Sequence, residues 1–543
     1  AFFIPYLVAL LTAGIPLMIL EMGIGQMMQG SAPTALRKVN RHTEWVGWFA
    51  LLVATCISIY YAAIMAYAVE YLVYSFKGFF TGGEMPWAGE TGNFFQSNVL
   101  NLTEMRNGEM VAAGLEKGSM WSPVWHVILG LIATWTAVFL IICRGVHRVG
   151  KVVMWTVPIP IAVLLVLIIR GLTLDGAGEG ILFYLTPDFS KLSNIDTWQA
   201  AYGQVFFSLT IGFGVMIAYA SYRPQKADIA NSAFITSFAN CMISFMAGFA
   251  VFSVLGFLAV REGKPIAEVV SGGPGLAFVT YPTAVSKMAE VGWLWAPITG
   301  VLFFLMLLFL GIDSLFSLVE AAVSGLRDRF PWLNQMVLTG LICLLGLAVG
   351  IVVFGSRSGI MWVDTIDYWT NNYGLVIVGL LQCVIVGYFY KTDLLRDYIN
   401  KVSEIKLWGW WELCVRVINP VVLGFLIVMK LIKDLGREGL YGIESASGTY
   451  FENWLPAAPI LMVALLLVAI LLSRLWSYFI LMAGGVLVAG VTWVLLPAMK
   501  GRFAASVFCG IASAILIGGL VLCLRVASRV AHQHHGDRKK GIQ

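Results

Sequence analysis

The sequence contains few charged residues. Asp, Glu, Lys and Arg together make up only 12% of its 543 residues, while hydrophobic residues make up 59%. A soluble globular domain carries roughly a quarter charged residues, so this composition excludes an ordinary soluble domain and favours a chain that lies in lipid. Short segments of alternating hydrophobicity, which are typical of membrane β-barrels, are missing as well.

The residue patterns of common catalytic sites are also missing. The sequence shows no Cys/His or Ser/His/Asp set, no cluster of metal ligands and no Gly-rich phosphate loop, so we expect no enzyme. The net charge of +5 reflects a few short basic connections rather than a basic face, so we expect no nucleic-acid partner. The eight cysteines lie in or beside apolar stretches, which favours small buried side chains over disulfides.

Long apolar runs dominate the sequence. A helix needs about 20 apolar residues to cross the hydrocarbon core of a bilayer. Thirteen stretches of about this length or more predict an all-α polytopic membrane protein: 1–28, 46–76, 124–144, 150–171, 197–222, 229–261, 293–325, 333–355, 366–391, 409–432, 456–474, 476–497 and 503–527.

Positive charge sets the predicted orientation. Basic connections follow apolar stretches that run in the same direction, at residues 37–41, 144–151, 223–226, 327–329 and 391–406. The positive-inside rule places such connections in the cytoplasm, so residue 1 is expected outside and the basic C-terminal tail inside. Lys430, Lys433 and Arg437 fall outside on this count and depart from the rule.

Two connections on the predicted outer side are long. Residues 77–123 are polar, with Gly and Asn, and are expected to form an extracellular loop. Residues 263–292 mix apolar and turn residues, which favours a packed hairpin that covers a vestibule as a lid. The alternative is an ordinary surface excursion.

Residues 205–222, VFFSLTIGFGVMIAYASY, contain a helix-weakening stretch inside an apolar run. Gly212 and Gly214 relax the helix, and Ser208 and Thr210 add hydroxyls. A helix that breaks at membrane depth exposes backbone groups, and secondary transporters use such groups to bind ions and substrates. The alternative is that the small residues allow close packing between helices.

Carboxylates in apolar runs are costly and mark candidate functional sites. Glu21 needs donors, which an unwound neighbouring helix is able to supply; the alternative is a position at headgroup level. Asp313 and Ser314 offer hard oxygen ligands for a cation such as Na⁺, or a hydrogen bond between helices. Asp364 and Asp367 share a helix face and either narrow an outer vestibule or begin an interfacial helix.

Tyr60 and Tyr61 lie in a further apolar run. A buried Tyr hydroxyl needs a hydrogen-bond partner, and either a substrate carboxylate or a neighbouring helix is able to provide it. The pair alone does not distinguish these two interpretations.

Four segments, in this order, resemble the neurotransmitter:sodium symporter family: AFFIPYLVALLTAGIPLMILEMGIGQ, GQVFFSLTIGFGVMIAYASY, GPGLAFVTYP and LGIDSLF. The resemblance implies a bundle of two five-helix inverted repeats with additional C-terminal helices. It places a transporter core at 1–392, and C-terminal helices with a basic tail at 393–543. Because AFFIPY is similar to the start of the family's second helix, and the chain begins inside an apolar run without Met, we expect a fragment that lacks the first helix.

The resemblance also implies roles for single residues. Tyr61 is similar to the Tyr that binds the substrate carboxylate, and Phe207 to an aromatic lid over the substrate. Asp364 resembles an outer-gate acid, and Asp328, with Tyr222 beside it, resembles an inner-gate acid. The other implied residues line the substrate pocket (Ile57, Thr210, Phe213, Ser314 and Leu318), bind one sodium (Ser208 and Asn240) or bind a second sodium (the Leu310 carbonyl, Asp313 and Ser314).

Ser244 lies one helical turn after Asn240, at a position that separates branches of the family. Chloride-independent bacterial members have a carboxylate there, and chloride-dependent members have Ser. Tyr6, Gln204, Ser208 and Ser244 all offer hydrogen-bond donors, and pairing with a sodium reduces the cost of burying an anion. We therefore expect chloride dependence; the alternative is an acid elsewhere that replaces the anion.

These features together predict Na⁺-coupled, chloride-dependent symport of a neutral, hydrophobic amino acid by alternating access, in the plasma (inner) membrane. The alternatives are a monoamine or osmolyte substrate, or an amino-acid sensor that does not transport. The expected partners are the amino acid and the lipid bilayer, with further copies of the chain as an open alternative. Because the first helix supplies part of these sites in the family, the fragment alone is expected not to transport.

Overall fold

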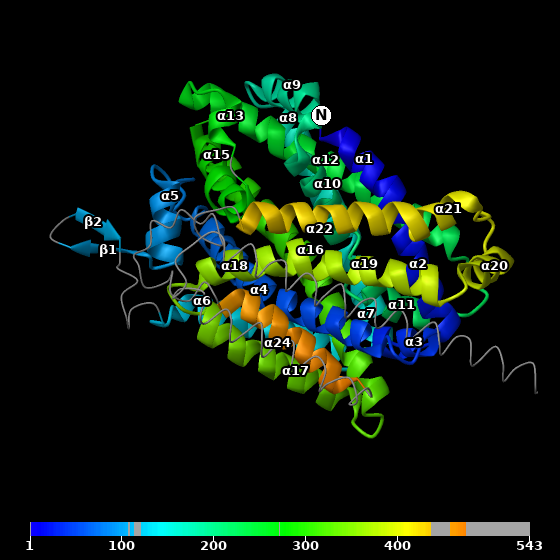
Figure 1. Cartoon of the computed structure of the whole chain (residues 1–543). Coiled ribbons are helices and arrows are strands. Elements are labelled where there is room, and N and C mark those ends of the chain that lie inside the picture. Colours follow the sequence, from blue (N-terminus) through cyan, green and yellow to red (C-terminus); the bar gives the residue numbers. More distant parts are fainter. Residues whose placement is uncertain are drawn as a thin grey trace, which may run out of the picture.

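The computed structural model describes residues 2–106, 109–112, 121–270, 272–290, 292–435 and 457–473. Most of these residues are helical, which confirms the all-α prediction. Within them, the exception is a two-stranded antiparallel hairpin in the long 77–123 connection, β1 (Thr103–Arg106) and β2 (Glu109–Ala112). Figure 1 shows the hairpin beside α5 (Thr91–Phe94), at the opposite end of the molecule from α3 (Ala32–Val39) and α20 (Thr392–Val402).

Nine helical segments of the described residues are long and apolar enough to cross a membrane, so the chain is a multi-pass membrane protein. They consist of α1 (Phe3–Ala9), η1 (Leu10–Gly14) and α2 (Ile15–Met28); α4 (Glu44–Lys77); α6 (Trp125–Ile142); α7 (Val146–Thr156) and α8 (Pro158–Leu172); α12 (Ala230–Glu262); α16 (Trp295–Arg329); α17 (Gln335–Val349) and η6 (Gly350–Phe354); α18 (Gly359–Trp369), η7 (Thr370–Leu375), α19 (Val376–Val384) and η8 (Ile385–Phe389); and α21 (Gly409–Leu413), η9 (Cys414–Ile418) and α22 (Asn419–Leu435).

Four of the thirteen predicted stretches are not among these nine. The stretch 197–222 divides into two short helices, α10 (Ile195–Ser208) and α11 (Val215–Ser221), while 456–474 forms the shorter helix α24 (Ala457–Leu472). The predicted stretches 476–497 and 503–527 lie outside the described residues.

The long helices α4 and α16 form the centre of the bundle. They contain 34 and 35 residues, and both carry apolar residues on most of their faces, which is typical of helices that are surrounded by others. They pack along each other, and α4 also contacts α3, α6 and α24. One contiguous hydrophobic core runs through these contacts.

The basic connections gather at one end of the bundle. The backbone N–H and the hydroxyl of Ser31 donate to Asp328 at 2.8 and 2.6 Å. Gln26 Nε2 donates to the Pro224 carbonyl at 2.7 Å, and the Tyr398 hydroxyl donates to Gln26 Oε1 at 3.2 Å. Connections far apart in the sequence thus share one end of the bundle.

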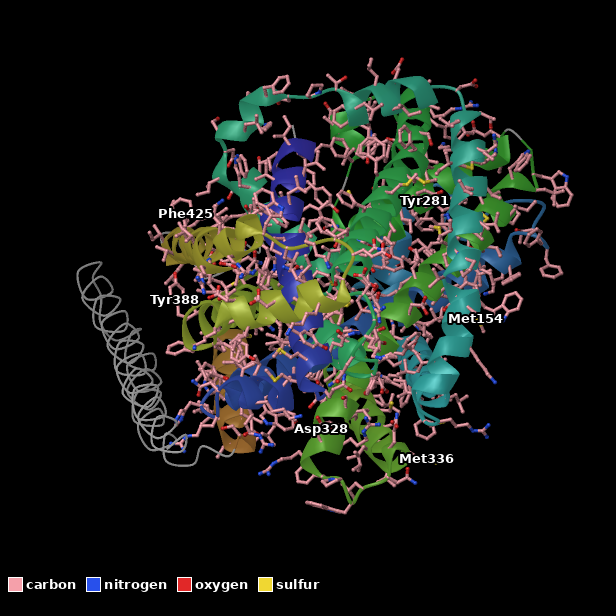
Figure 2. All side chains as sticks on the ribbon, turned by 90° about the vertical axis from the view of Figure 1, so that its right-hand side faces the viewer. Met154, Tyr281, Asp328, Met336, Tyr388 and Phe425 are labelled. Atoms are coloured by element: carbon pink, nitrogen blue, oxygen red, sulfur yellow. The ribbon has the colours of Figure 1, made fainter. Side chains whose placement is uncertain are left out.

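The second long connection is helical and packed. Its Phe278 is fully buried and accepts a hydrogen bond at its carbonyl from the Tyr71 hydroxyl at 2.6 Å, while Trp87 Nε1 donates to the Pro282 carbonyl at 2.9 Å. Figure 2 shows Tyr281 well separated from Asp328. The short elements here and in the connection before α10 are α9 (Ala177–Leu185), η3 (Phe189–Ser193), α13 (Ile266–Val269), α14 (Gly273–Gly275), η4 (Leu276–Thr280), α15 (Tyr281–Lys287) and η5 (Met288–Glu290).

Candidate functional site

The helix break predicted from two glycines is present between α10 and α11. Three residues there have positive φ: Thr210 at 52°, Gly212 at 85° and Gly214 at 74°. Glycine adopts this left-handed conformation without steric cost, whereas it is rare for a β-branched residue such as Thr. The Ile211 N–H turns back to the Phe206 carbonyl at 3.0 Å, so regular helical pairing is interrupted in the middle of the stretch.

Glu21 of α2 holds the backbone of this break. Its side chain is fully buried, and Oε1 accepts hydrogen bonds from the Gly212 N–H at 3.1 Å and from Gln382 Nε2 at 2.8 Å. A buried carboxylate requires such donors. The structure therefore places Glu21 toward the interior, with a backbone donor from an unwound helix.

Ser208 and Asn240 lie together at the end of α10. Asn240 Nδ2 donates to Ser208 Oγ at 2.5 Å, which joins the break to α12. The hydroxyl and amide oxygens of this pair are ligands of the kind that small hard cations prefer.

The second predicted cation set lies midway along α16. Thr156 Oγ1 donates to Asp313 Oδ1 at 2.6 Å, and Ser314 Oγ donates to the Leu310 carbonyl at 3.3 Å. The Tyr61 hydroxyl lies beside Ser314. Asp313 is thus held from α7, whereas Ser314 adjoins the Tyr that is predicted to bind the substrate carboxylate.

The predicted pocket residues come from three parts of the bundle and differ in burial, since Ile57, Phe213 and Leu318 are buried and the others are partly buried or exposed. Phe213 is 1% and Leu318 4% exposed, and Phe207, the predicted lid, is 36% exposed. The Phe207 and Phe213 rings meet edge to face with centroids 6.1 Å apart, a favourable aromatic geometry. The full set is Ile57 and Tyr61 on α4, Phe207, Thr210 and Phe213 at the break, and Ser314 and Leu318 on α16.

The four residues predicted to hold chloride lie on neighbouring helices. Tyr6 of α1 is buried beside Cys241 of α12, which precedes Ser244 by about one turn. Gln204 and Ser244 are exposed, whereas Ser208 is half-buried. Within the described residues, no hydrogen bond joins the members of this set to one another.

The two predicted inner residues have different partners. Asp328 accepts from Ser31, as described above, whereas the Tyr222 hydroxyl donates to Glu320 Oε1 at 3.2 Å. The Arg327 guanidinium lies 5.7 Å from the centroid of the Tyr222 ring. The structure thus brings Tyr222 to Glu320, a buried carboxylate, rather than to Asp328.

The two outer aspartates are also unlike each other. Asp364 is exposed. Asp367 Oδ1 accepts from the Tyr60 hydroxyl at 2.5 Å and from Asn371 Nδ2 at 2.6 Å. Asp367 is therefore tied to α4, one residue away from Tyr61, and Asp364 is not held by these groups.

Sequence reasoning missed three polar residues that the structure connects to the predicted site: Thr156, Glu320 and Gln382. Each had a detectable signal. Thr156 lies two residues before Pro158, where freed backbone in a membrane helix calls for polar partners. Glu320 follows Asp313 by two helical turns in an apolar run, and Gln382 is a single polar residue in the run VIVGLLQCVIVG, so both met the criterion for costly polar groups in lipid.

Comparison with known proteins relates this chain to a family of transporters. The model of the sodium:neurotransmitter symporter family matches residues 1–480. An uncharacterized sodium-dependent transporter of Methanocaldococcus jannaschii is 37% identical over 433 residues, which cover 79% of this chain and 82% of that protein. A sodium-dependent dopamine transporter of Caenorhabditis elegans is 32% identical, with 79% and 74% of the two chains covered. The sodium- and chloride-dependent neutral and basic amino acid transporter B(0+) of Mus musculus is 31% identical, with 80% and 74% covered.

Proposed function

Since the chain belongs to the sodium:neurotransmitter symporter family, whose members are sodium-coupled transporters and not enzymes, we propose that it couples Na⁺ entry to uptake of a neutral, hydrophobic amino acid. Ion and substrate binding shift the balance between outward-open and inward-open states, which is alternating access. Chloride is proposed to move with the substrate. The protein is proposed to lie in the plasma (inner) membrane with its C-terminus in the cytoplasm.

The observation that most supports this proposal is the fixed break at Gly212. A fully buried carboxylate, Glu21, holds the Gly212 N–H at 3.1 Å, so the break is a defined structure rather than a frayed helix end. Broken helices at membrane depth are tolerated only where they are buried in protein or line a cavity. Backbone groups freed there are suited to bind a substrate ammonium or a cation.

Two sets of oxygen atoms, one at this break and one on α16, are proposed to bind one Na⁺ each. One set is Ser208 with Asn240, and the other is Asp313 with Ser314 and the Leu310 carbonyl. Carboxylate, hydroxyl, amide and carbonyl oxygens suit a hard cation. For chloride we propose the donors of Tyr6, Gln204, Ser208 and Ser244. This proposal is supported by the packing of α1 against α10 and by Tyr6 of α1, which lies beside Cys241 of α12.

The substrate class follows from one polar group in an apolar surrounding. Tyr61 is proposed to bind the amino-acid carboxylate, while Ile57, Phe207, Phe213 and Leu318 contact its side chain, with Thr210 and Ser314 at the edge. A pocket with few polar groups selects for an apolar ligand of matching shape. The dopamine transporter among the relatives makes a monoamine the second candidate, and an osmolyte or a sensor without transport are further alternatives.

The conformational change is proposed to use acids at both ends. Asp364 serves the outer gate, while Asp328 and Tyr222 serve the inner gate. The packed connection 263–292 covers the outer side as a lid. These elements belong to a proposed core of residues 1–392, with the remaining helices outside it.

The test is transport by the full-length protein in liposomes. We would measure uptake of labelled leucine, dopamine and taurine under an inward Na⁺ gradient, with chloride or gluconate outside. Leucine uptake that needs both ions supports the proposal. Uptake that needs Na⁺ but not chloride contradicts the proposed chloride site. Uptake of dopamine or taurine in preference to leucine contradicts the proposed substrate class. Na⁺-dependent binding of leucine without accumulation identifies a sensor.

A further inference from the structure

Asp434 is a buried carboxylate that no part of the proposed site uses. It lies in the last turn of α22, and its side chain is 2% exposed. The Tyr368 hydroxyl donates to Oδ1 at 2.5 Å, and the Tyr373 hydroxyl donates to Oδ2 at 2.6 Å. Hydrogen bonds to an ionised acceptor are shorter and stronger than neutral ones. Both carboxylate oxygens of Asp434 are therefore satisfied by residues of one neighbouring segment.

The two tyrosines lie on either side of the junction between α18 and η7. Tyr368 is in the last turn of α18, and Tyr373 is within the π-helical segment η7. A π-helical turn is rare and occurs mostly as a single bulge, often at functional sites. Asn372 Nδ2 bonds the Tyr368 carbonyl at 2.8 Å, and the Trp369 and Tyr373 rings stack with centroids 4.8 Å apart. Asp434 thus clamps the bulge from a different helix, in addition to its local contacts.

The other end of η7 touches the helix break. A Cβ atom added at Gly212 would lie 3.0 Å from the Leu375 carbonyl oxygen, so the last residue of η7 lies directly against the Gly212 turn. Tyr373 precedes Leu375 by two residues, and the Gly212 N–H donates a hydrogen bond to Glu21. A continuous series of contacts therefore runs from Asp434 through Tyr373 and Leu375 to Gly212.

We propose that Asp434 is a positioning residue, which sets the place of η7 and thereby the shape of the Gly212 turn. Helix α22 lies alongside α19 (Figure 1). It acts on the site through the Asp434 carboxylate and does not contact an ion or a substrate. The effect on the turn follows from the contacts alone, and its effect on transport rests on the proposed function. A π-helical segment is rare and occurs mostly as a single turn, so we expect its conformation to depend on such outside support.

The experiment compares Asp434→Asn with a matched change one residue away. Lys433 forms an exposed ion pair with Asp196, with its Nζ 2.6 Å from Oδ1, so Lys433→Gln alters the same helix end without touching η7. Hydrogen exchange is measured on the full-length protein in nanodiscs, in NaCl and in choline chloride. We expect Asp434→Asn to speed exchange about tenfold both at 370–375 and at 209–214, since hydrogen bonds to a charged group are the stronger ones. Lys433→Gln should leave both segments unchanged.

A second variant keeps the test informative if Asp434→Asn folds poorly. Tyr373→Phe removes one donor and leaves the carboxylate, and we expect about a threefold faster exchange at 209–214. In the double variant the two effects should not add, because both changes act on the same hydrogen bond, that between Tyr373 and residue 434. Additive effects, or faster exchange confined to the end of α22, would overturn the positioning role.

Transport separates the two proposals. In the liposome assay, Asp434→Asn should raise the Na⁺ concentration for half-maximal leucine uptake by about threefold or more, while Lys433→Gln leaves it unchanged. If the wild type moves no substrate but exchange at 209–214 responds to Asp434→Asn, the proposed function fails and the positioning role stands. If the wild type transports and Asp434→Asn changes neither the exchange nor the Na⁺ dependence, the positioning role fails alone.

Discussion

The broken helix α10–α11 and the unbroken helix α16 contain similar residues in apolar runs, yet only one of them breaks. The break contains two hydroxyl residues and two glycines, namely Ser208, Thr210, Gly212 and Gly214. In α16, the segment with Gly311, Asp313 and Ser314 stays helical throughout a helix of 35 residues. Hydroxyls alone do not open a membrane helix, since their donors are satisfied within it, as when the Ser314 hydroxyl donates to the Leu310 carbonyl at 3.3 Å.

The glycines of the two helices serve different purposes. Gly212 has a φ of 85° and donates its N–H to Glu21. Gly311 is helical, and a Cβ there would lie 2.0 Å from Met65 Sδ of α4, so it allows α16 and α4 to approach closely. One glycine supplies backbone conformation, and the other supplies space. The carboxylate partner also differs, because Glu21 holds backbone in one case and Asp313 is itself held by Thr156 in the other.

The largest effect should come from removing the support of the break. Glu21→Ala leaves the Gly212 N–H and the Gln382 amide without their buried acceptor, at about 1–3 kcal/mol for each group. We expect uptake by the full-length protein to fall to background and its thermal unfolding midpoint to drop. Glu21→Gln retains an oxygen at the position of Oε1, which accepts from both donors, and should lose less. If both variants transport like the wild type, the break does not depend on Glu21.

Gly212 and Gly311 can be compared directly when each is replaced by alanine. Gly212→Ala places a side chain in the left-handed region, which costs roughly 1–2 kcal/mol, and its Cβ also faces the Leu375 carbonyl at 3.0 Å. We expect about a tenfold loss of uptake. Gly311→Ala should also be harmful, but the obstacle is the flexible end of the Met65 side chain.

Second-site changes distinguish the two kinds of glycine. Met65→Ala makes room for the new methyl group and should restore uptake in Gly311→Ala, as measured on the double variant. Leu375→Ala should not restore Gly212→Ala, because the obstacle there is backbone. Rescue of Gly212→Ala by Leu375→Ala would show that space rather than conformation is what Gly212 provides.

A smaller effect is expected at the contact between α7 and α16. Thr156→Val removes the hydroxyl that donates to Asp313 Oδ1 at 2.6 Å. Groups that orient a metal ligand typically affect affinity about tenfold or more, and for a weakly bound Na⁺ we expect the half-saturating concentration to rise roughly threefold to tenfold. Thr156→Ser keeps the hydroxyl and should behave like the wild type. If the Na⁺ dependence of uptake is unchanged in Thr156→Val, Asp313 does not bind the ion in the way proposed.

Local chemistry explains what was predictable from the sequence. Two glycines close together in an apolar run predict a break, and a carboxylate such as Glu21 in another run predicts a need for donors; the structure shows both and joins them. The resemblance to the family predicted the fold, because the match to the family extends over most of the chain. None of this required knowledge of which helices are neighbours.

The remaining contacts depend on tertiary packing. Asp364 and Asp367 lie on one helix face, so periodicity treats them alike, yet only Asp367 meets Tyr60 and Asn371. The partner of Asp313 is 157 residues away in the sequence, and Tyr222 reaches Glu320 across 98 residues. Polar pairs between helices are fixed by how the helices cross, which no local pattern contains. For that reason the partners of several predicted residues could not be foreseen from the sequence.

The smallest effect should come from a carboxylate that holds backbone N–H groups at the surface, as Glu21 does in the interior. Asp228 follows α11, and it accepts from the N–H of Glu404 at 2.9 Å and of Asn231 at 3.0 Å. Partial burial alone would raise the pKa of Asp228, but these hydrogen bonds to the ionised form hold its pKa below the ordinary value. The carboxylate therefore stabilises the fold at neutral pH. This contribution is complete above the ordinary carboxyl pKa of about 3.9 and is lost as the pH falls through the lower pKa of the folded state.

Asp228→Asn should consequently lower the thermal unfolding midpoint at pH 7 by only about 1–2 °C, because solvent screens a partly exposed group. The difference between wild type and variant should shrink as the pH is lowered below about 4, measured on the purified protein in detergent across that range. Glu21 lies in the interior, where water does not replace the lost hydrogen bonds, so the same change of a carboxylate to an amide should have a larger effect there. If the difference in unfolding midpoint between wild type and Asp228→Asn stays constant or widens in acid, the ionised carboxylate is not what stabilises the fold there. If that difference is as large as the one for Glu21→Gln, burial is not what makes Glu21 important to the break.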